Sequence, residues 1–323
     1  MFVFMKRIFS LFVVVLVLLY GCVTAPIAPT TADHAYGYFD DGSLLGRYAP
    51  IIAPQQTALE YNRIGHAAAR LDEGGNEEIY INTDQPVIYT QEQDFTTARG
   101  NRYRNLIYRF HFSEVPQWNL TAGKNGGLFV VITLNEKQQP VLITTVHSCG
   151  CYLAMVPTSY LDVAAYPEKW DVKNQEVYGE TLPGRLDYPA TFSSDLRPLI
   201  ALRSATHRVM DVAVVNRDQY GKEGSAVQLL SADALEHLPL GKGETSFFYP
   251  SGPDKGYVKG TFKPWEFLWM SWWSLDRHVG IDKRLGDPAE TGTVFYTSLK
   301  PWAREASNMW FFADFLEYWG WRL

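Results

Sequence analysis

The sequence contains little of the chemistry that most catalytic and metal-binding sites use, with only 3 cysteines and 7 histidines among its 323 residues. Its formal net charge is −6, so it lacks the basic excess that neutralises phosphates, and this argues against nucleic acid as a partner. Charged residues make up only 20% and hydrophobic residues 46%, a balance that argues against disordered, fibrous and polytopic membrane proteins. Internal repeats, long Ser/Gly linkers and charge blocks are also missing, which predicts one domain.

The N-terminus carries one long apolar run. Lys6 and Arg7 precede residues 8–20, which are uncharged and mainly apolar. A short positive segment followed by such a run is typical of an export signal, and the run is short for a membrane span. It ends in Leu19-Tyr20-Gly21-Cys22, which resembles the lipobox of bacterial lipoproteins.

The resemblance implies that residues 1–21 are a signal peptide and that Cys22, carrying acyl chains such as palmitate, becomes the first mature residue. Lipoproteins of the enterobacterial inner membrane usually carry Asp where this chain has Val23, so in a Gram-negative host the resemblance implies the outer membrane, facing the periplasm. Loss of residues 1–21 would remove Lys6 and Arg7 but no acidic residue, changing the net charge from −6 to −8. Since an acidic body is not attracted to anionic lipid, the acyl chains would supply the attachment.

The mature chain is predicted to begin with a tether. Residues 23–33 contain two prolines and small residues without apolar periodicity, a composition typical of an extended linker. We expect the folded part to start between Tyr36 and Ile51. The predicted organisation is therefore a lipidated Cys22 and tether over residues 22–50, followed by a single domain over residues 51–323.

Hydrophobic periodicity predicts a mixed set of strands and helices. Strands are predicted over residues 78–81, 87–90, 102–112, 127–134, 141–147, 209–215 and 245–249. Helices are predicted over residues 55–71, 232–237 and 307–319. Alternation within 102–112 predicts one buried face, and the almost continuously apolar 127–134 predicts a central strand in an antiparallel hairpin over 127–148. This mixture predicts an α+β fold with a hairpin-containing sheet and a Trp-rich helical C-terminal region.

Soft metal ligands cluster at one place, in His147, Cys149 and Cys151. If a strand continued through them, its period of two would put all three on one face, with successive Cα atoms about 6.6 Å apart. One imidazole and two thiolates suit Zn or Cu, although a closed zinc site needs a fourth ligand. Exported cysteines are usually oxidised, so a small disulfide ring across Gly150 is the second interpretation. The third leaves both thiols free, either inert or as a nucleophile paired with a distant histidine.

Aromatic residues are abundant at 15%, and eight of the 10 tryptophans lie between Trp265 and Trp321. Trp265, Trp269, Trp272 and Trp273 fall at i, i+4, i+7 and i+8, which is one face of a helix. Because large aromatic side chains in a stripe usually pack into a core, we predict that this stripe is buried. A membrane-interface face, a glycan-stacking platform and a partner surface are the alternatives.

Together these patterns predict an outer-membrane-anchored periplasmic lipoprotein that acts as a binding or envelope-accessory module. The competing hypothesis is a thiol- or metal-dependent envelope enzyme that uses His147, Cys149 and Cys151. The anchor makes the membrane a partner, whereas the sequence pattern points to no particular protein, glycan or cofactor.

Overall fold

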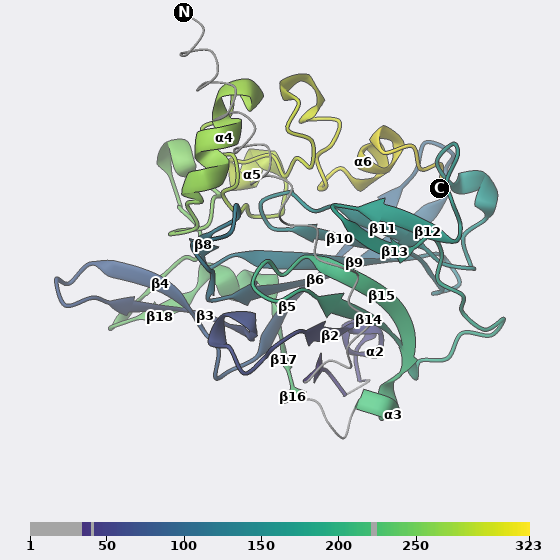
Figure 1. The fold of residues 1–323 in the computed structure, drawn as a ribbon, viewed down its shortest axis with the longest axis horizontal. Helices are drawn as coiled ribbons and strands as arrows, with labels where there is room; N and C mark the ends of the chain where they lie inside the picture. Colours follow the sequence, from purple (N-terminus) through teal and green to yellow (C-terminus); the bar gives the residue numbers. More distant parts are fainter. Residues whose placement is uncertain (1–33, 40–41, 221–224) are drawn as a thin grey trace, which may run out of the picture. The chain divides into compact units, whose positions relative to one another are not determined.

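Two β-sheets carry most of the described structure (Figure 1). The computed structural model describes residues 34–39, 42–220 and 225–323. The predicted signal peptide and the lipidation site Cys22 therefore lie outside the described residues.

The larger sheet has eight strands in the order β11-β10-β9-β6-β3-β4, with β5 paired to β6 and β17 paired to β5. Its strands are β3 (Ile64–Leu71), β4 (Glu77–Asn82), β5 (Val87–Thr96), β6 (Arg102–Phe112), β9 (Gly127–Leu134), β10 (Pro140–His147), β11 (Ala154–Pro157) and β17 (Gln228–Ser231). β9 and β10 pair antiparallel and are buried along their whole length, which confirms the predicted central hairpin.

The smaller sheet has five strands in the order β15-β14-β2-β1-β16. These are β1 (Tyr36–Gly37), β2 (Ile51–Pro54), β14 (Leu196–Leu202), β15 (Val209–Asn216) and β16 (Ser225–Ala226). Three two-stranded ribbons complete the described strands: β7 (Glu114–Val115) with β8 (Gly123–Lys124), β12 (Asn174–Val177) with β13 (Glu180–Pro183), and β18 (Leu238–Leu240) with β19 (Gly243–Thr245).

The helices are short. They are α2 (Leu44–Tyr48), α3 (Arg217–Tyr220), α4 (Pro264–Ser274), α5 (Pro288–Thr291) and α6 (Phe312–Tyr318), with 3₁₀ turns η1 (Glu60–Asn62), η2 (Val163–Ala165), η3 (Ala232–Glu236), η4 (Gly252–Asp254) and η5 (Pro301–Ala303). The chain is thus mainly β with few helices, which confirms the α+β prediction only in this coarser form. Among the described helices, the longest, α4, has 11 residues, and none is long and apolar enough to cross a bilayer.

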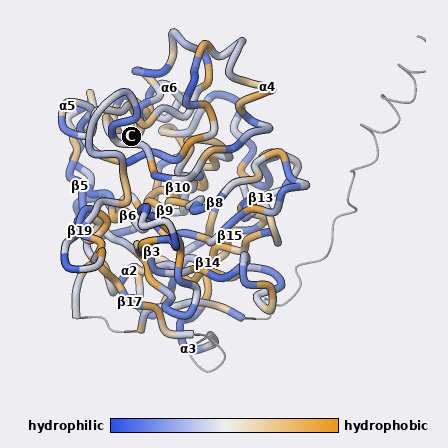
Figure 2. Tube along the Cα trace, turned by 90° about the vertical axis from the view of Figure 1, so that its left-hand side faces the viewer, coloured by the Kyte–Doolittle hydropathy of each residue, from blue (hydrophilic) through white to orange (hydrophobic). Residues whose placement is uncertain are grey.

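The large sheet is covered on both faces, so both faces of β6 are buried and the prediction of one buried face was incomplete. Tyr108 and Phe110 pack with Ile200 of β14 in the core between the two sheets. On the opposite face, Ile107 packs in a second core with Phe315 of α6. In Figure 2, β6, β9 and β10 lie between β14 on one side and α6 on the other.

The helix predicted over residues 55–71 is wrong, because its C-terminal half is strand β3. The spacing of Ile64, Ala68 and Leu71 suits a helix, but pairing with β4 and with the end of β6 gives this backbone a ladder of hydrogen bonds. The intrinsic preference of alanine for a helix is weak, and pairing with neighbouring strands overrides it.

Several other boundaries moved. The C-terminal helix predicted over 307–319 is confined to α6, the strand predicted over 245–249 shrinks to the end of β19, and the helix predicted over 232–237 is the 3₁₀ turn η3. The strands predicted at 78–81, 87–90, 102–112 and 209–215 are confirmed. β1 begins at Tyr36 and α2 follows it, so the described elements start within the range Tyr36 to Ile51 that was expected for the start of the folded part, and before residue 51.

Candidate functional site

The β9–β10 hairpin is followed by a tight turn closed by a disulfide. Cys149 and Cys151 are bonded through their sulfurs, with their Cα atoms 5.6 Å apart. Within the turn, the Gly150 amide donates to the His147 carbonyl at 2.7 Å, and the His147 amide donates to the Cys151 carbonyl at 2.9 Å. These bonds reverse the chain at His147, so the strand does not continue and its period of two does not apply to the three soft ligands.

Gly150 is the residue that permits this turn. Its φ is +92°, and a Cβ built on it would lie 2.1 Å from the Tyr296 carbonyl oxygen. We expect Gly150→Ala to cost about 3 kcal/mol or more in the free energy of unfolding, because backbone strain and overpacking add. Gly179, with φ +83° and nothing near its Cβ position, is the control, and Gly179→Ala should cost only about 1–2 kcal/mol. Urea unfolding measures both, and equal costs would contradict the steric argument.

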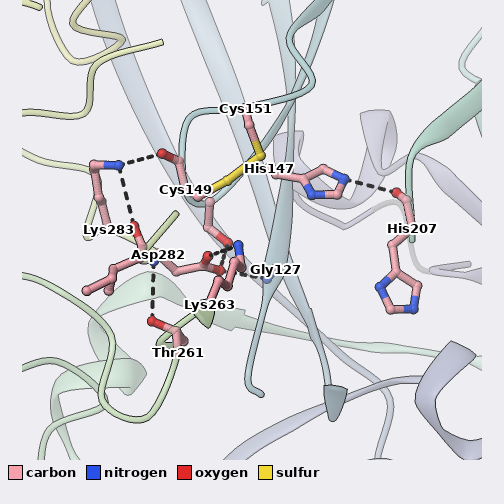
Figure 3. The surroundings of a disulfide bond; sticks show 11 residues. Gly127, His147, Cys149, Cys151, His207, Thr261, Lys263, Asp282 and Lys283 are labelled. Carbon is pink, nitrogen blue, oxygen red and sulfur yellow. Dashed lines mark hydrogen bonds and ion pairs between the residues drawn. A yellow bond between two sulfur atoms is a disulfide. The ribbon is translucent and has the colours of Figure 1, made fainter. Parts of the chain in front are cut away.

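The His147 ring extends from the turn toward His207 and away from the Lys263–Asp282 pair (Figure 3). Its Nε2 donates to the His207 carbonyl at 3.2 Å, and the His207 ring in turn donates to the Tyr61 carbonyl at 2.8 Å. Burial lowers the pKa of His147 to about 4 and that of His207 to about 3. Both rings are therefore neutral structural donors at ordinary pH.

Metal binding at the turn would require the disulfide to be reduced first, since thiolates are the ligands. Within residues 34–39, 42–220 and 225–323, no three His, Cys, Asp or Glu side chains are grouped so that they could hold an ion. Of the three interpretations of His147, Cys149 and Cys151, the described structure shows the disulfide. It places no fourth ligand beside these residues that would complete a zinc or copper site.

A buried cluster of charges underlies the turn, and the sequence pattern did not indicate it. The Asp282 carboxylate accepts hydrogen bonds from the Lys263 ammonium group at 3.0 Å, from the Ser148 hydroxyl at 2.5 Å and from the Gly127 amide at 2.8 Å. The neighbouring Lys283 donates its ammonium group to the Cys149 carbonyl (Figure 3). All of these side chains are buried, so the cluster binds the hairpin turn to the C-terminal part of the chain.

The charges in this cluster stabilise one another. Burial alone would raise the pKa of Asp282, but the Lys263 charge and the hydrogen bond from Ser148 hold it below its usual value. Burial alone would lower the pKa of Lys263, but the charges of Asp282 and Glu266 raise it. Burial does lower the pKa of Lys283, to about 8. Lys263 and Asp282 are thus a buried ion pair, and Lys263 immediately precedes α4.

Helix α4 exposes its apolar side and buries its acidic residue, the opposite of an ordinary surface helix. The prediction that its tryptophan stripe is buried is therefore wrong. Trp269 is 63% and Trp272 73% exposed, and Trp265 and Trp273 are also exposed. The side chains that α4 buries are Ser274 and Glu266, its one charged residue. Glu266 packs over Gly280 beside Lys263. The helix was predicted correctly, but its acidic side chain lies inward near the Lys263–Asp282 pair and its aromatic side is left in solvent.

The exposed aromatic surface extends beyond both ends of α4. At its start, the Trp265 indole donates to the Gln117 carbonyl at 3.2 Å, next to the exposed Trp118. At its end, Arg304 donates to the Ser274 carbonyl, close in sequence to Trp302, which is 82% exposed. We call this surface the aromatic face, and define it by the exposed residues Trp118, Phe262, Trp265, Phe267, Leu268, Trp269, Trp272, Trp273, Leu275 and Trp302.

The sequence signal for this face was available. The segment PWEFLWMSWWS contains two serines and a single charged residue, Glu266. A helix that packs on a core normally places charged residues on its opposite side. Their absence over α4 indicates a helix that meets an apolar environment on several sides.

Comparison with known proteins found no matching family model, no similar curated protein and no similar solved structure.

Proposed function

We propose that the chain is an outer-membrane lipoprotein, anchored through Cys22, whose periplasmic α+β domain docks on the bilayer surface through the aromatic face. The observation that carries this proposal is the exposure of apolar side chains along a helix whose one charge is buried. The α+β class rests on the gathering of α4, α5 and α6 on one side of the large sheet (Figure 1).

A lipid interface fits the aromatic face better than a protein groove does. A protein groove binds one narrow stripe of a helix, typically the side chains at i, i+3, i+4 and i+7. Here Phe267 and Leu268 are exposed together with Trp269, so neighbouring positions around the helix all face outward. A fluid apolar phase accommodates such a surface, and tryptophan, with its ring and its N–H, is enriched at the membrane–water boundary.

The predicted tether limits how far the domain can lie from the membrane. Residues 23–33 lie between Cys22 and His34, and this length of chain reaches at most about 43 Å. The acyl chains on Cys22 would hold the protein at the membrane, and the aromatic face would bring the domain itself onto the bilayer surface. Because α4 carries no positive charge, this docking would depend on apolar burial, consistent with an acidic protein.

The test separates the face from the anchor. A protease site is placed in the tether between residues 23 and 33, the lipidated protein is reconstituted in phosphatidylethanolamine–phosphatidylglycerol vesicles, and the tether is cut. We expect the released domain to stay with the vesicles, and Trp269→Ser with Trp272→Ser to release it. Each tryptophan contributes about 1.5–3 kcal/mol of burial, about tenfold or more in the partition coefficient. Cosedimentation measures this.

The matched control removes exposed apolar side chains elsewhere. Leu71 and Val163 are 55% and 60% exposed on β3 and η2. Leu71→Ser with Val163→Ser should leave vesicle binding unchanged. If cutting the tether released the wild-type domain, or if both double variants were released equally, docking through the aromatic face would be refuted. Absence of lipid labelling that depends on Cys22 would separately refute the anchor.

A further inference from the structure

A cavity of about 170 Å³ lies against the face of β6 that carries Ile107 and Arg109. Phe129 of β9 also lines it from the sheet, and Leu285 lines it from the C-terminal part of the chain. Its volume is close to the roughly 150 Å³ of an engineered protein cavity that accepts a benzene ring. The space therefore suits a molecule of about six to eight non-hydrogen atoms.

Arg109 is an incompletely satisfied charge in the wall of this cavity. The side chain is 3% exposed, and its Nε donates to His111 Nε2 at 2.8 Å while Nη1 donates to the Lys283 carbonyl at 3.2 Å. Its Nη2 has no hydrogen-bond partner in the described part of the chain. Among the same residues, no carboxylate forms an ion pair with it.

The protein around Arg109 compensates its charge only in part. The guanidinium carbon lies 5.0 Å from the centre of the Phe129 ring and 5.1 Å from that of Phe248. Burial lowers the pKa of Arg109 to about 10, against the opposing charge of Asp282, so the group remains charged at neutral pH. A buried charge without a paired carboxylate is costly, and an anion in the adjoining cavity would remove that cost.

The lining also carries acidic side chains. Arg284, the second arginine of the lining, is already paired with Glu236 at 3.0 Å. Asp233 and Glu290 also line the cavity and are exposed, so they lie toward solvent. A simple anion would meet this negative rim, whereas a ligand with an anionic and a cationic end would match both charges.

We propose that the cavity binds a small α-amino acid, with its carboxylate on Arg109 and its ammonium group toward Asp233 and Glu290. Alanine, with six non-hydrogen atoms, fits the volume. The charge-assisted bond to Nη2 would complete the hydrogen bonding of the buried guanidinium. This binding site does not depend on the aromatic face or on the lipid anchor.

The experiment uses the full-length protein in detergent micelles, titrated calorimetrically and by thermal unfolding with L-alanine, D-alanine, acetate and ethylammonium. We expect at least one alanine enantiomer to bind and to raise the melting temperature with concentration, at least about tenfold more tightly than acetate or ethylammonium. Failure of both enantiomers to bind would overturn the proposal. Acetate binding as tightly as alanine would overturn the part assigned to the acidic rim.

Variants separate binding from structure. Arg109→Met should lose at least about tenfold in alanine affinity, because it removes the charge that holds the carboxylate. It also removes the hydrogen bonds to His111 and to the Lys283 carbonyl, so alanine affinity and not the melting temperature of the free protein is the readout. Asp233→Asn with Glu290→Gln should weaken alanine but not acetate. If Arg109→Met fails to fold, Ala232→Leu, which fills the cavity from η3 and keeps Arg109, should abolish binding. Unchanged alanine affinity in Ala232→Leu would place the ligand elsewhere.

Discussion

Replacing Asp282 by asparagine is expected to lower the free energy of unfolding by about 3–5 kcal/mol, the cost of leaving a buried charge unpaired. Asparagine keeps one oxygen for the Ser148 hydroxyl and the Gly127 amide, but it turns an amide nitrogen toward the Lys263 ammonium. The ion pair joins the disulfide turn to the residue before α4, so its loss should also loosen that helix. Urea unfolding measures the cost.

A second substitution tests whether the unpaired ammonium is the cause. Lys263→Met in the Asp282→Asn background should recover part of the lost stability, because a buried ion pair replaced as a unit is often nearly neutral. The comparison pair is Arg70 and Glu78, which are 2.7 Å apart but exposed to solvent, and Glu78→Gln should cost far less than Asp282→Asn. If Asp282→Asn costs as little, the buried pair contributes no more than a surface pair.

The same ion pair explains why the sequence predicted α4 but not its orientation. Helical spacing of Trp265, Trp269 and Trp272 depends only on local geometry, and the helix forms where it was predicted. Lys263, the residue before α4, pairs with Asp282 farther along the chain, and the buried Glu266 lies within the electrostatic reach of both. A rule that buries the most apolar side of a helix cannot anticipate that an acidic side chain is buried next to an ion pair formed across the fold.

The strands also differ in whether local composition or pairing with distant segments determines them. The run 127–134 is apolar at nearly every position, so its central place in the sheet follows from composition alone. The Ala-rich residues 64–71 become a strand because β4 and β6 are available to pair with them. Arg109 alternates with apolar neighbours on β6, and the C-terminal layer that buries it comes from residues far along the chain, so the cavity beside it could not be predicted.

Acidification is expected to destabilise the protein most strongly. Burial holds the pKa of His111 and His207 at about 3 and that of His147 at about 4, whereas unfolded histidines titrate near 6.5. Below pH 6.5 the unfolded chain therefore binds protons that the folded chain refuses, and stability falls as the pH falls. Well below pH 6.5 each histidine contributes about 1.4 kcal/mol per pH unit, so the three together remove about 7 kcal/mol between pH 6.5 and 4.5.

That loss is comparable to the whole stability of an ordinary domain, so unfolding should begin near pH 5. Urea unfolding between pH 7 and 5 measures the slope, which approaches about 4 kcal/mol per pH unit at the acidic end. His207→Asn keeps the left-handed backbone at this position, where φ is +55°, and should reduce the slope by about a third. His237→Asn, at an exposed position, is the control for the loss of an imidazole. A slope that His207→Asn does not alter would show that this histidine accepts its proton in the folded protein, and that carboxylates drive the acid sensitivity instead.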